Sequence, residues 1–278
     1  MLDLSLLVSG GLGATILQKL YLSEHIVAVL TNAKSTVIIN FCQEKQIPCF
    51  VGNPRKGATK QFLKDKNCDL LLSVNYLFLV EEDLIRWPKY FAINLHGSLL
   101  PKYRGRTPHV WAIINGENQT GITAHLMEVE VDNGAIVEQV VLPIGSEDTG
   151  AMILEKFQEQ YPVLVERIIK KVKENSLTSY EQDSSQATYF GKRTPLDGEI
   201  NWEWSKERIR NWVRAQAAPY PGAFFFDKEE KIVVHKATYS NKGFDYQMPN
   251  GTFLEKTKHY YLVKVGNGVI RMSDLKKI

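Results

Sequence analysis

The sequence predicts an α/β fold, in which a mostly parallel sheet carries helices on both faces and is followed by a small β-rich domain. Over the first hundred residues, short apolar runs alternate with runs that have helical spacing. The apolar runs are continuous, which is typical of strands buried on both faces of a sheet. From about Phe224 onward, short strands are separated by turn residues, which is typical of a small barrel or sandwich.

The first half of the chain supplies the parallel sheet. Strands are expected at residues 2–8, 25–30, 48–51, 69–73 and 91–94. Helices are expected between them, at residues 14–22, 35–45, 58–66 and 81–87. Strand and helix alternate throughout this half, as in a sheet that is covered on both faces.

The second half has a different character. Two strands are expected at residues 122–129 and 136–144, and the loop between them carries Asp132. A long amphipathic helix follows at residues 149–173, and the polar segment at residues 174–189 is interpreted as a linker. Ser205 is the expected N-cap of one more helix. Turn signals then divide the β-rich end at Asp227-Lys228, Asn241-Lys242-Gly243, Asn250-Gly251 and Asn267-Gly268. We therefore expect one domain over residues 1–185, and a linker helix with a β-rich domain over residues 186–278.

Composition and charge exclude several classes of protein. Of 278 residues, 44% are hydrophobic and 23% are charged, which is the balance of a globular protein. The net charge of +3 is too small for a surface that wraps nucleic acid. Three cysteines without a CxxC pair predict free thiols, and we expect no metal. No apolar run resembles a signal peptide or approaches the roughly 20 residues of a membrane span, so we expect a cytoplasmic protein that does not insert into membranes.

The glycine-rich turn Ser9-Gly10-Gly11-Leu12-Gly13 ends the first strand, where a dinucleotide could bind. Its spacing differs from GxGxxG, because Thr15-Ile16 follows where the third glycine would fall. The second strand ends in Thr31-Asn32 and has no acidic residue there for a ribose. The sequence therefore favours a tight turn packed against the sheet over a dinucleotide site.

The segment from Ile93 to Gly105 carries the chemistry. Asn94 and His96 are two residues apart on a strand, so both side chains project from the same side of it. Ligands of open α/β sheets bind at the carboxyl ends of strands, where this pair lies. Asn94 can stabilise an oxyanion, His96 can take a proton from an amine, and a carboxylate such as Asp132 can orient the histidine. These are the groups that acyl transfer to an amine requires.

Spacing alone leaves simpler alternatives open. A single histidine after an apolar strand is more often a structural residue than a catalytic one. Asp132, in Val131-Asp132-Asn133-Gly134, could equally form a turn. Ser98 is adjacent to the pair but lacks the GxSxG setting of a nucleophile.

The same segment, followed by Thr107-Pro108, resembles the motif of the 10-formyltetrahydrofolate-dependent formyltransferases. That family has an Asn-x-His pair, then SLLPxYRG, and an Asp about three dozen residues later. Asn94, His96 and Asp132 match those positions, so the resemblance implies that they are the catalytic residues. It also implies a Rossmann-like N-terminal domain without a nicotinamide, an OB-like C-terminal domain and 10-formyltetrahydrofolate as co-substrate.

Members of this family hold the folate ring on a loop after a strand. The matching segment here is Ser73-Val74-Asn75-Tyr76-Leu77-Phe78-Leu79, and we expect its last three residues, Leu77, Phe78 and Leu79, to bind the folate together with Val131. The alternative is that the three residues after the strand are simply part of the core.

The acceptor is predicted from the second half of the resemblance. The branch that formylates nucleotide-linked amino sugars has sequences similar to this chain at residues 189–195, at Trp202 and at residues 219–223. We therefore expect a nucleotide-linked amino sugar, with dTDP as the nucleotide, and a homodimer, which is common in that branch. Methionyl-tRNA is the competing acceptor, but residues after Phe224 mix acidic and basic side chains. A binding module for folate or sugar nucleotide, without activity, is the non-enzymatic alternative.

A nucleotide-sugar requires cationic or hydroxyl donors for its pyrophosphate and an aromatic face for its base. A structural ion pair is the alternative for Arg104. The candidate substrate-binding residues are Ser98, Tyr103, Arg104, Arg106, Thr107, His109, Tyr189 and Arg193.

Overall fold

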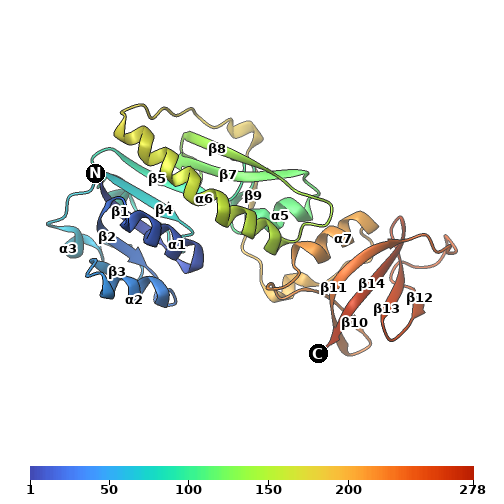
Figure 1. Cartoon of the computed structure of the whole chain (residues 1–278). Coiled ribbons are helices and arrows are strands. Elements are labelled where there is room, and N and C mark those ends of the chain that lie inside the picture. Colours follow the sequence, from blue (N-terminus) through green and yellow to red (C-terminus); the bar gives the residue numbers. More distant parts are fainter. The chain divides into compact units, whose positions relative to one another are not determined.

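The computed structural model describes residues 1–278 and contains a seven-stranded sheet in the order β3-β2-β1-β4-β5-β7-β8 (Figure 1). The strands from β3 to β5 are parallel to their neighbours, and β7 is antiparallel to β5. This confirms the predicted α/β class. The strands are β1 (Asp3–Val8), β2 (His25–Thr31), β3 (Cys49–Val51), β4 (Leu70–Val74), β5 (Phe91–His96), β7 (Gln119–Leu126) and β8 (Ile136–Pro143).

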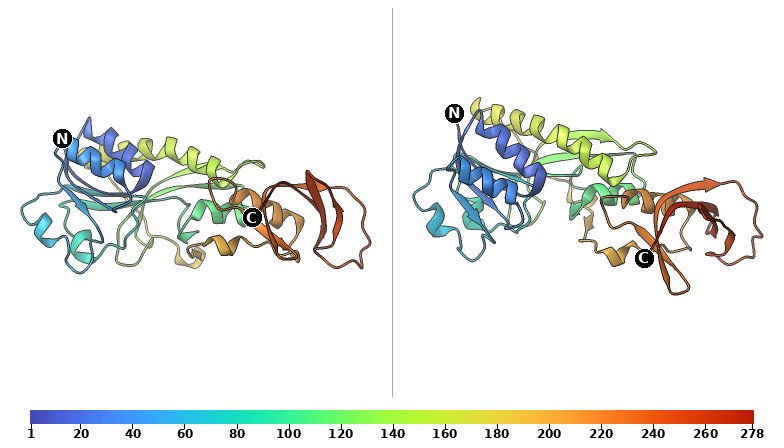
Figure 2. Two further views of the ribbon diagram at one scale, coloured as in Figure 1. Left: turned by 90° about the horizontal axis from the view of Figure 1, so that it is seen from below. Right: turned by 60° about the horizontal axis from the view of Figure 1, so that its bottom comes forward.

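Helices cover both faces of this sheet. In Figure 2, α1, α2 and the C-terminal part of α6 lie on one face, and α3 and α4 lie on the other. The helices are α1 (Gly10–Tyr21), α2 (Thr36–Glu44), α3 (Lys60–Leu63), α4 (Glu82–Ile85), α5 (Pro108–Ile114), α6 (Gly150–Lys173) and α7 (Lys206–Ala215). Helix α5 is absent from the sequence-based prediction; it begins at a proline, whose fixed φ suits the first helical position.

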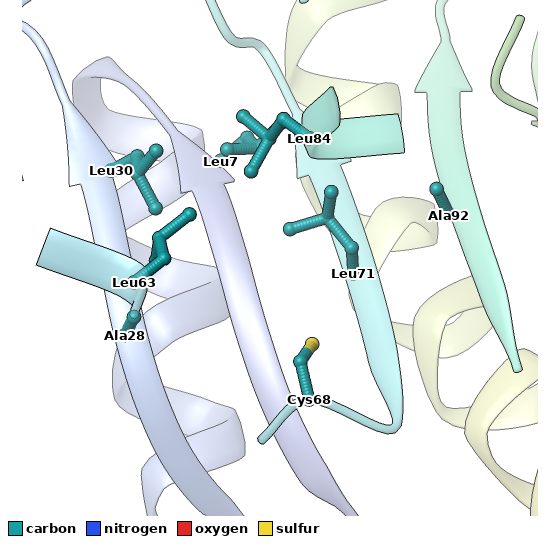
Figure 3. Packing of buried hydrophobic residues seen from close by; sticks show 8 residues of the cluster. All are labelled: Leu7, Ala28, Leu30, Leu63, Cys68, Leu71, Leu84 and Ala92. Carbon is teal, nitrogen blue, oxygen red and sulfur yellow. The ribbon is translucent and has the colours of Figure 1, made fainter. Parts of the chain in front are cut away.

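The face under α3 and α4 shows why the apolar runs form a sheet. Figure 3 shows Leu63 of α3 and Leu84 of α4 packed over Leu7, Leu30 and Leu71 of three neighbouring strands. Each of these side chains is buried, and burying a leucine stabilises a fold by about 1.5–3 kcal/mol. This packing stabilises the strands whose carboxyl ends form one edge of the sheet.

The glycine-rich turn after β1 lets α1 pack closely on the sheet. Gly10 has a φ of +63°, which favours glycine. A Cβ on Gly13 would lie 2.9 Å from the Cβ of Val8. These positions thus form the tight turn that the sequence favours.

The C-terminal part is a five-stranded antiparallel sheet in the order β10-β11-β14-β13-β12, as predicted. Ser205 caps α7 by accepting a hydrogen bond from the Arg208 amide, which confirms the expected cap. The strands are β10 (Ala223–Asp227), β11 (Glu230–Ser240), β12 (Phe253–Lys256), β13 (Tyr260–Val265) and β14 (Gly268–Lys277). Short elements complete the chain: β6 (Arg104–Gly105) paired with β9 (Tyr189–Phe190), and the 3₁₀ turns η1 (Ser184–Gln186) and η2 (Pro195–Gly198).

The chain forms two compact units that do not divide at a single boundary. Unit 1 comprises residues 1–105, 121–141 and 157–189. Unit 2 comprises residues 106–120, 142–156 and 190–278, so it includes α5 and the start of α6 as well as the C-terminal sheet. The expected domains, residues 1–185 and 186–278, remain a prediction from the chain order, since sequence patterns do not reveal which distant segments pack together.

Candidate active site

Strand β5 extends to His96, two residues beyond the predicted end. Asn94 and His96 therefore both lie within the strand, on the same side, at the carboxyl end of the parallel part of the sheet. Both residues belong to unit 1, as do the residues around them described below.

His96 is buried and held by two partners. Its Nε2 donates to the carbonyl of Tyr103 at 2.8 Å, which fixes the proton on that nitrogen when the ring is neutral. Its Nδ1 lies 3.4 Å from Oδ1 of Asp132, which is also buried. The nitrogen beside the carboxylate is thus the one that can accept a proton. The structure brings Asn94, His96 and Asp132 together, as the sequence predicts.

A second histidine, His125, belongs to this cluster and was missed by sequence reasoning. The antiparallel register of β5 and β7 places it directly opposite Asn94, and their side-chain nitrogens are 3.1 Å apart. His125 Nε2 also lies 3.7 Å from Oδ1 of Asp132. In the sequence it is one of several polar residues of its strand, and nothing there indicates which strand pairs with which.

The loop that carries Asp132 is closely constrained. Asp132 has a φ of +58°, in the left-handed region that residues with a Cβ seldom adopt. Its Oδ2 accepts a hydrogen bond of 2.9 Å from the Gly105 amide. A Cβ on Gly134 would lie 1.9 Å from the carbonyl oxygen of Leu126, so only glycine fits there. The carboxylate therefore reaches His96 through a fixed backbone path.

Burial and neighbouring charges act in opposite directions on the pKa values of His96 and Asp132. Burial lowers the pKa of His96, while Asp132 and the Tyr103 carbonyl oppose this and only partly offset it. Burial alone would raise the pKa of Asp132, but His96, His125 and the Gly105 amide together lower it to about 2. At neutral pH the site thus combines an ionised carboxylate with a neutral imidazole at residue 96, which is the state of a general base.

The segment predicted to hold folate is exposed and is not part of the core. Leu77 and Leu79 are 46% and 50% exposed, and Phe78 is partly buried. They lie directly after β4, whose carboxyl end adjoins that of β5. Val131, in the Asp132 loop, is 48% exposed. Exposed apolar side chains at a ligand-binding edge favour a binding role over the core alternative.

The other candidate substrate-binding residues in unit 1 differ in their hydrogen-bond partners. Arg104 is only 1% exposed; it donates to Gln182 Oε1 through Nε and Nη2, and to the Tyr189 hydroxyl through Nη1. This favours a structural role for Arg104, although with uncharged partners rather than in the ion pair considered from sequence. Ser98 is buried and donates to the Lys102 carbonyl, and Tyr103 contributes its carbonyl to His96.

In unit 2, the candidates differ in exposure. Arg106 and Thr107 are exposed, while His109 is buried with a ring nitrogen 2.7 Å from the Tyr220 hydroxyl. The Arg193 guanidinium lies against the rings of Trp111 and Trp212, at 5.1 Å and 4.1 Å from their centroids. Its Nη2 donates to the Asp197 carbonyl and to Gln216, whereas Nη1 is buried without a hydrogen-bond partner.

Two further features bear on the class of site. No group of three or more His, Cys, Asp or Glu side chains is placed to hold a metal ion, and the three cysteines are free thiols. None of the helices combines the length and the apolar character that crossing a membrane would demand.

The fold resembles solved structures of formyltransferases along almost the whole chain. An N-formyltransferase from Helicobacter canadensis, in complex with folinic acid and dTDP-3-aminofucose, has a TM-score of 0.77 at 19% identity, over 99% of this chain and 100% of that one. WlaRD, a sugar 3N-formyl transferase solved with dTDP and 5-N-formyl-THF, has a TM-score of 0.76 at 17% identity, over 99% and 98%. A methionyl-tRNA formyltransferase from Clostridium thermocellum has a TM-score of 0.62 at 16% identity, over 100% and 99%. These likenesses establish a shared fold.

The family itself follows from sequence models that match two parts of the chain. Residues 10–169 match the model described as formyl transferase, and residues 192–278 match the formyl transferase C-terminal domain. The first match alone covers more than half of the chain and includes the cluster around His96. The chain therefore belongs to the formyl transferase family, as the motif from Ile93 to Gly105 predicts.

Proposed function

We propose that this chain transfers the formyl group of 10-formyltetrahydrofolate to the primary amine of a nucleotide-linked amino-dideoxyhexose, with dTDP as the nucleotide. The observation that carries the proposal is the cluster of Asn94, His96, His125 and Asp132 at the end of β5. It joins an amide donor, a neutral imidazole and an ionised carboxylate in one buried network. These are the groups that direct attack of an amine on a formyl carbon needs.

Each group has a role in the proposed reaction. The amine nitrogen bonds to the formyl carbon, and the formyl oxygen gains negative charge that an Asn94 N–H stabilises. His96 takes the amine proton on Nδ1, the nitrogen that faces Asp132, or passes it to the departing folate nitrogen. The carboxylate of Asp132 stabilises the imidazolium while it exists. Collapse of the tetrahedral species then breaks the bond between the formyl carbon and the folate nitrogen.

The folate donor is supported by the exposed apolar segment after β4. The pterin ring is flat and largely apolar, and Leu77 and Leu79 offer exposed apolar surface beside the end of β5. The neighbours from Helicobacter canadensis and WlaRD were solved with formylated folates, which agrees with this assignment.

The amino-sugar acceptor is supported by the two neighbours that carry dTDP or a dTDP-sugar and that match this chain over its full length. A tRNA acceptor would require unpaired basic surface for phosphates. Several lysines of the C-terminal sheet instead form ion pairs with carboxylates: Lys242 with Glu255, Lys256 with Asp227, and Lys277 with Glu230. We therefore favour the sugar over methionyl-tRNA.

An acceptor screen tests the proposal. The protein is mixed with 10-formyltetrahydrofolate and with a panel of dTDP-linked 3-amino and 4-amino dideoxyhexoses, and tetrahydrofolate release is followed by absorbance. Methionyl-tRNA and an amino acid serve as competing acceptors. We expect release with at least one dTDP-amino sugar, and mass spectrometry should show the formylated product. Release with methionyl-tRNA alone would overturn the sugar assignment.

The same screen separates an enzyme from a binding module. Tight folate binding without release for any acceptor would favour the module. Exposed Arg106 and Thr107, directly after β6, are our candidates for acceptor contacts among the predicted residues. The homodimer and the cytoplasmic location that the sequence suggests remain predictions.

A further inference from the structure

The polar segment at residues 174–189, expected to be a linker, sends one side chain to the Asp132 loop. Gln182 donates from Nε2 to the carbonyl of Asp132 at 2.9 Å and to the carbonyl of Gly134 at 2.8 Å. Its Oε1 accepts from Arg104 through Nε at 3.2 Å and Nη2 at 2.7 Å. Two donors and two lone pairs exhaust the capacity of an amide, so every polar atom of this side chain is in use.

The orientation of the Gln182 amide follows from its neighbours. Arginine can only donate, so the amide oxygen must face Arg104. Backbone carbonyls can only accept, so the amide nitrogen must face Asp132 and Gly134. Arg104 is buried and is itself anchored by the Tyr189 hydroxyl at 2.6 Å. Gln182 thus links the loop to a buried and anchored arginine.

The loop needs such support because of its backbone. Asp132 adopts a positive φ, and a strained conformation persists only where the surroundings hold it. The Gly105 amide fixes the Asp132 carboxylate, while Gln182 fixes the carbonyls on the two sides of Asn133. Gln182 therefore holds the backbone of the loop, and Gly105 holds the Asp132 side chain. Together these contacts set the 3.4 Å distance between Asp132 Oδ1 and His96 Nδ1.

We propose that Gln182 is a positioning residue for Asp132, acting as a clamp between Arg104 and the backbone of the loop at residues 132–134. The catalytic part of this inference rests on the proposed function, because it assumes that Asp132 assists His96 in formyl transfer. The clamp also makes a prediction about loop dynamics that does not depend on any substrate.

The experiment compares Gln182→Met and Gln182→Glu with the wild type in the full chain. Methionine has a similar length but no polar amide, and glutamate keeps the acceptor for Arg104 but cannot donate to the two carbonyls. Gln186→Met is the matched control, because Gln186 is an exposed glutamine of the same segment that donates to Asp183. Hydrogen–deuterium exchange of a peptide spanning residues 130–135 is measured together with kcat and KM.

We expect both Gln182 variants to exchange faster than wild type in this peptide and to lose kcat on the order of ten- to a hundredfold, the scale of a small misplacement of reacting groups. KM for folate and acceptor should stay near the wild-type values. Because general destabilisation would also lower the apparent kcat at unchanged KM, kcat is expressed per folded enzyme, and exchange in peptides outside residues 130–135 should match the wild type. Gln186→Met should match wild type in every measurement. If Gln182→Met fails to fold, Gln182→Glu still carries the test, because its carboxylate pairs with Arg104.

Wild-type exchange and kcat in Gln182→Glu would overturn the clamp, because donation to the loop would then be dispensable. A loss of kcat without faster exchange at residues 130–135 would overturn it as well. The clamp and the proposed function can fail separately. If the wild type formylates no acceptor but its Gln182 variants still exchange faster, the clamp is supported and the proposed function is rejected.

Discussion

The side-chain nitrogen of Asn94 lies 3.1 Å from Nε2 of His125, across the antiparallel pair of β5 and β7. Nδ1 of the same histidine donates to the Leu126 carbonyl at 2.8 Å. In the neutral ring, Nε2 therefore presents a lone pair, which accepts one N–H of Asn94. This sets the orientation of the amide, and in the proposed reaction its second N–H binds the formyl oxygen.

Removing the Asn94 amide or the His96 imidazole should abolish most of the activity. We expect Asn94→Ala to lower kcat by about 10²–10³-fold, the loss usual for an oxyanion donor. His96→Ala should cost about 10²–10⁴-fold, the range of a general base. His259→Ala, at an exposed position of the C-terminal sheet, is the control and should retain wild-type rates. If both active-site variants fold and keep near-native kcat, the proposed mechanism is wrong.

Replacing His125 should have a smaller effect than replacing Asn94. His125→Ala removes the acceptor that orients the Asn94 amide but leaves the amide itself, so we expect a loss in kcat of about tenfold, the worth of one hydrogen bond. Steady-state kinetics on the single and double variants provide the measurement. Because the histidine acts through Asn94, the double variant should be no slower than Asn94→Ala, and additive losses would contradict this relationship.

The pH dependence of the rate should report on His96. Burial lowers the pKa of His96 from 6.5, so its neutral form persists to lower pH and kcat/KM should decline only below that value. The Asp132 charge raises the pKa of His96 against this effect. Asp132→Asn should therefore move the acid limb to still lower pH, in addition to reducing the rate.

The control for this profile is Asp65→Asn, which removes an exposed carboxylate elsewhere. Its acid limb should coincide with that of the wild type. A shift of the limb to higher pH in Asp132→Asn would contradict the assignment of the limb to His96.

A methyl group at residue 134 should disrupt the Asp132 loop. Because the Cβ of Gly134→Ala would fall 1.9 Å from the Leu126 carbonyl oxygen, the backbone must move. We expect a loss of about 1–3 kcal/mol in the free energy of unfolding, as for overpacking, and a marked loss of kcat. Urea unfolding and kinetics measure both. Gly243→Ala, with no atom within 4 Å of the added Cβ, should leave both unchanged.

Polar substitution in the segment after β4 should weaken folate binding selectively. Leu79→Ser removes apolar surface that we expect the pterin to cover, so KM for 10-formyltetrahydrofolate should rise about three- to tenfold with little change in kcat. Leu196→Ser, at a leucine that is 78% exposed in η2, is the matched control. An unchanged KM in Leu79→Ser would place the folate elsewhere.

The sequence predicts most of the sheet because its strands are buried on both faces. Buried runs such as Leu70–Val74, apolar except for Ser73, are typical in length and composition of strands inside a covered sheet. Helix α5 escaped prediction because six of its seven residues are buried, so it shows no alternation of apolar and polar residues at helical spacing.

Local pattern predicted only those site residues that are neighbours in sequence, and Asp132 was added by the family resemblance. Asn94 and His96 share one strand, and their joint direction follows from its pleat. His125 and Gln182 reach the site through antiparallel pairing and through a segment far along the chain. Such contacts depend on tertiary packing, and no local pattern in the sequence encodes them.

The backbone passes from one compact unit to the other after residues 105, 120, 141, 156 and 189. A protease cut or gene truncation after residue 120, 141 or 156 would divide both units, and one after residue 105 or 189 would divide only one of them. Residues 190–278, expressed without residues 106–120, would lack α5, which packs against α7. Exchanging the whole of unit 2 between relatives would consequently require transplanting three separate stretches at once.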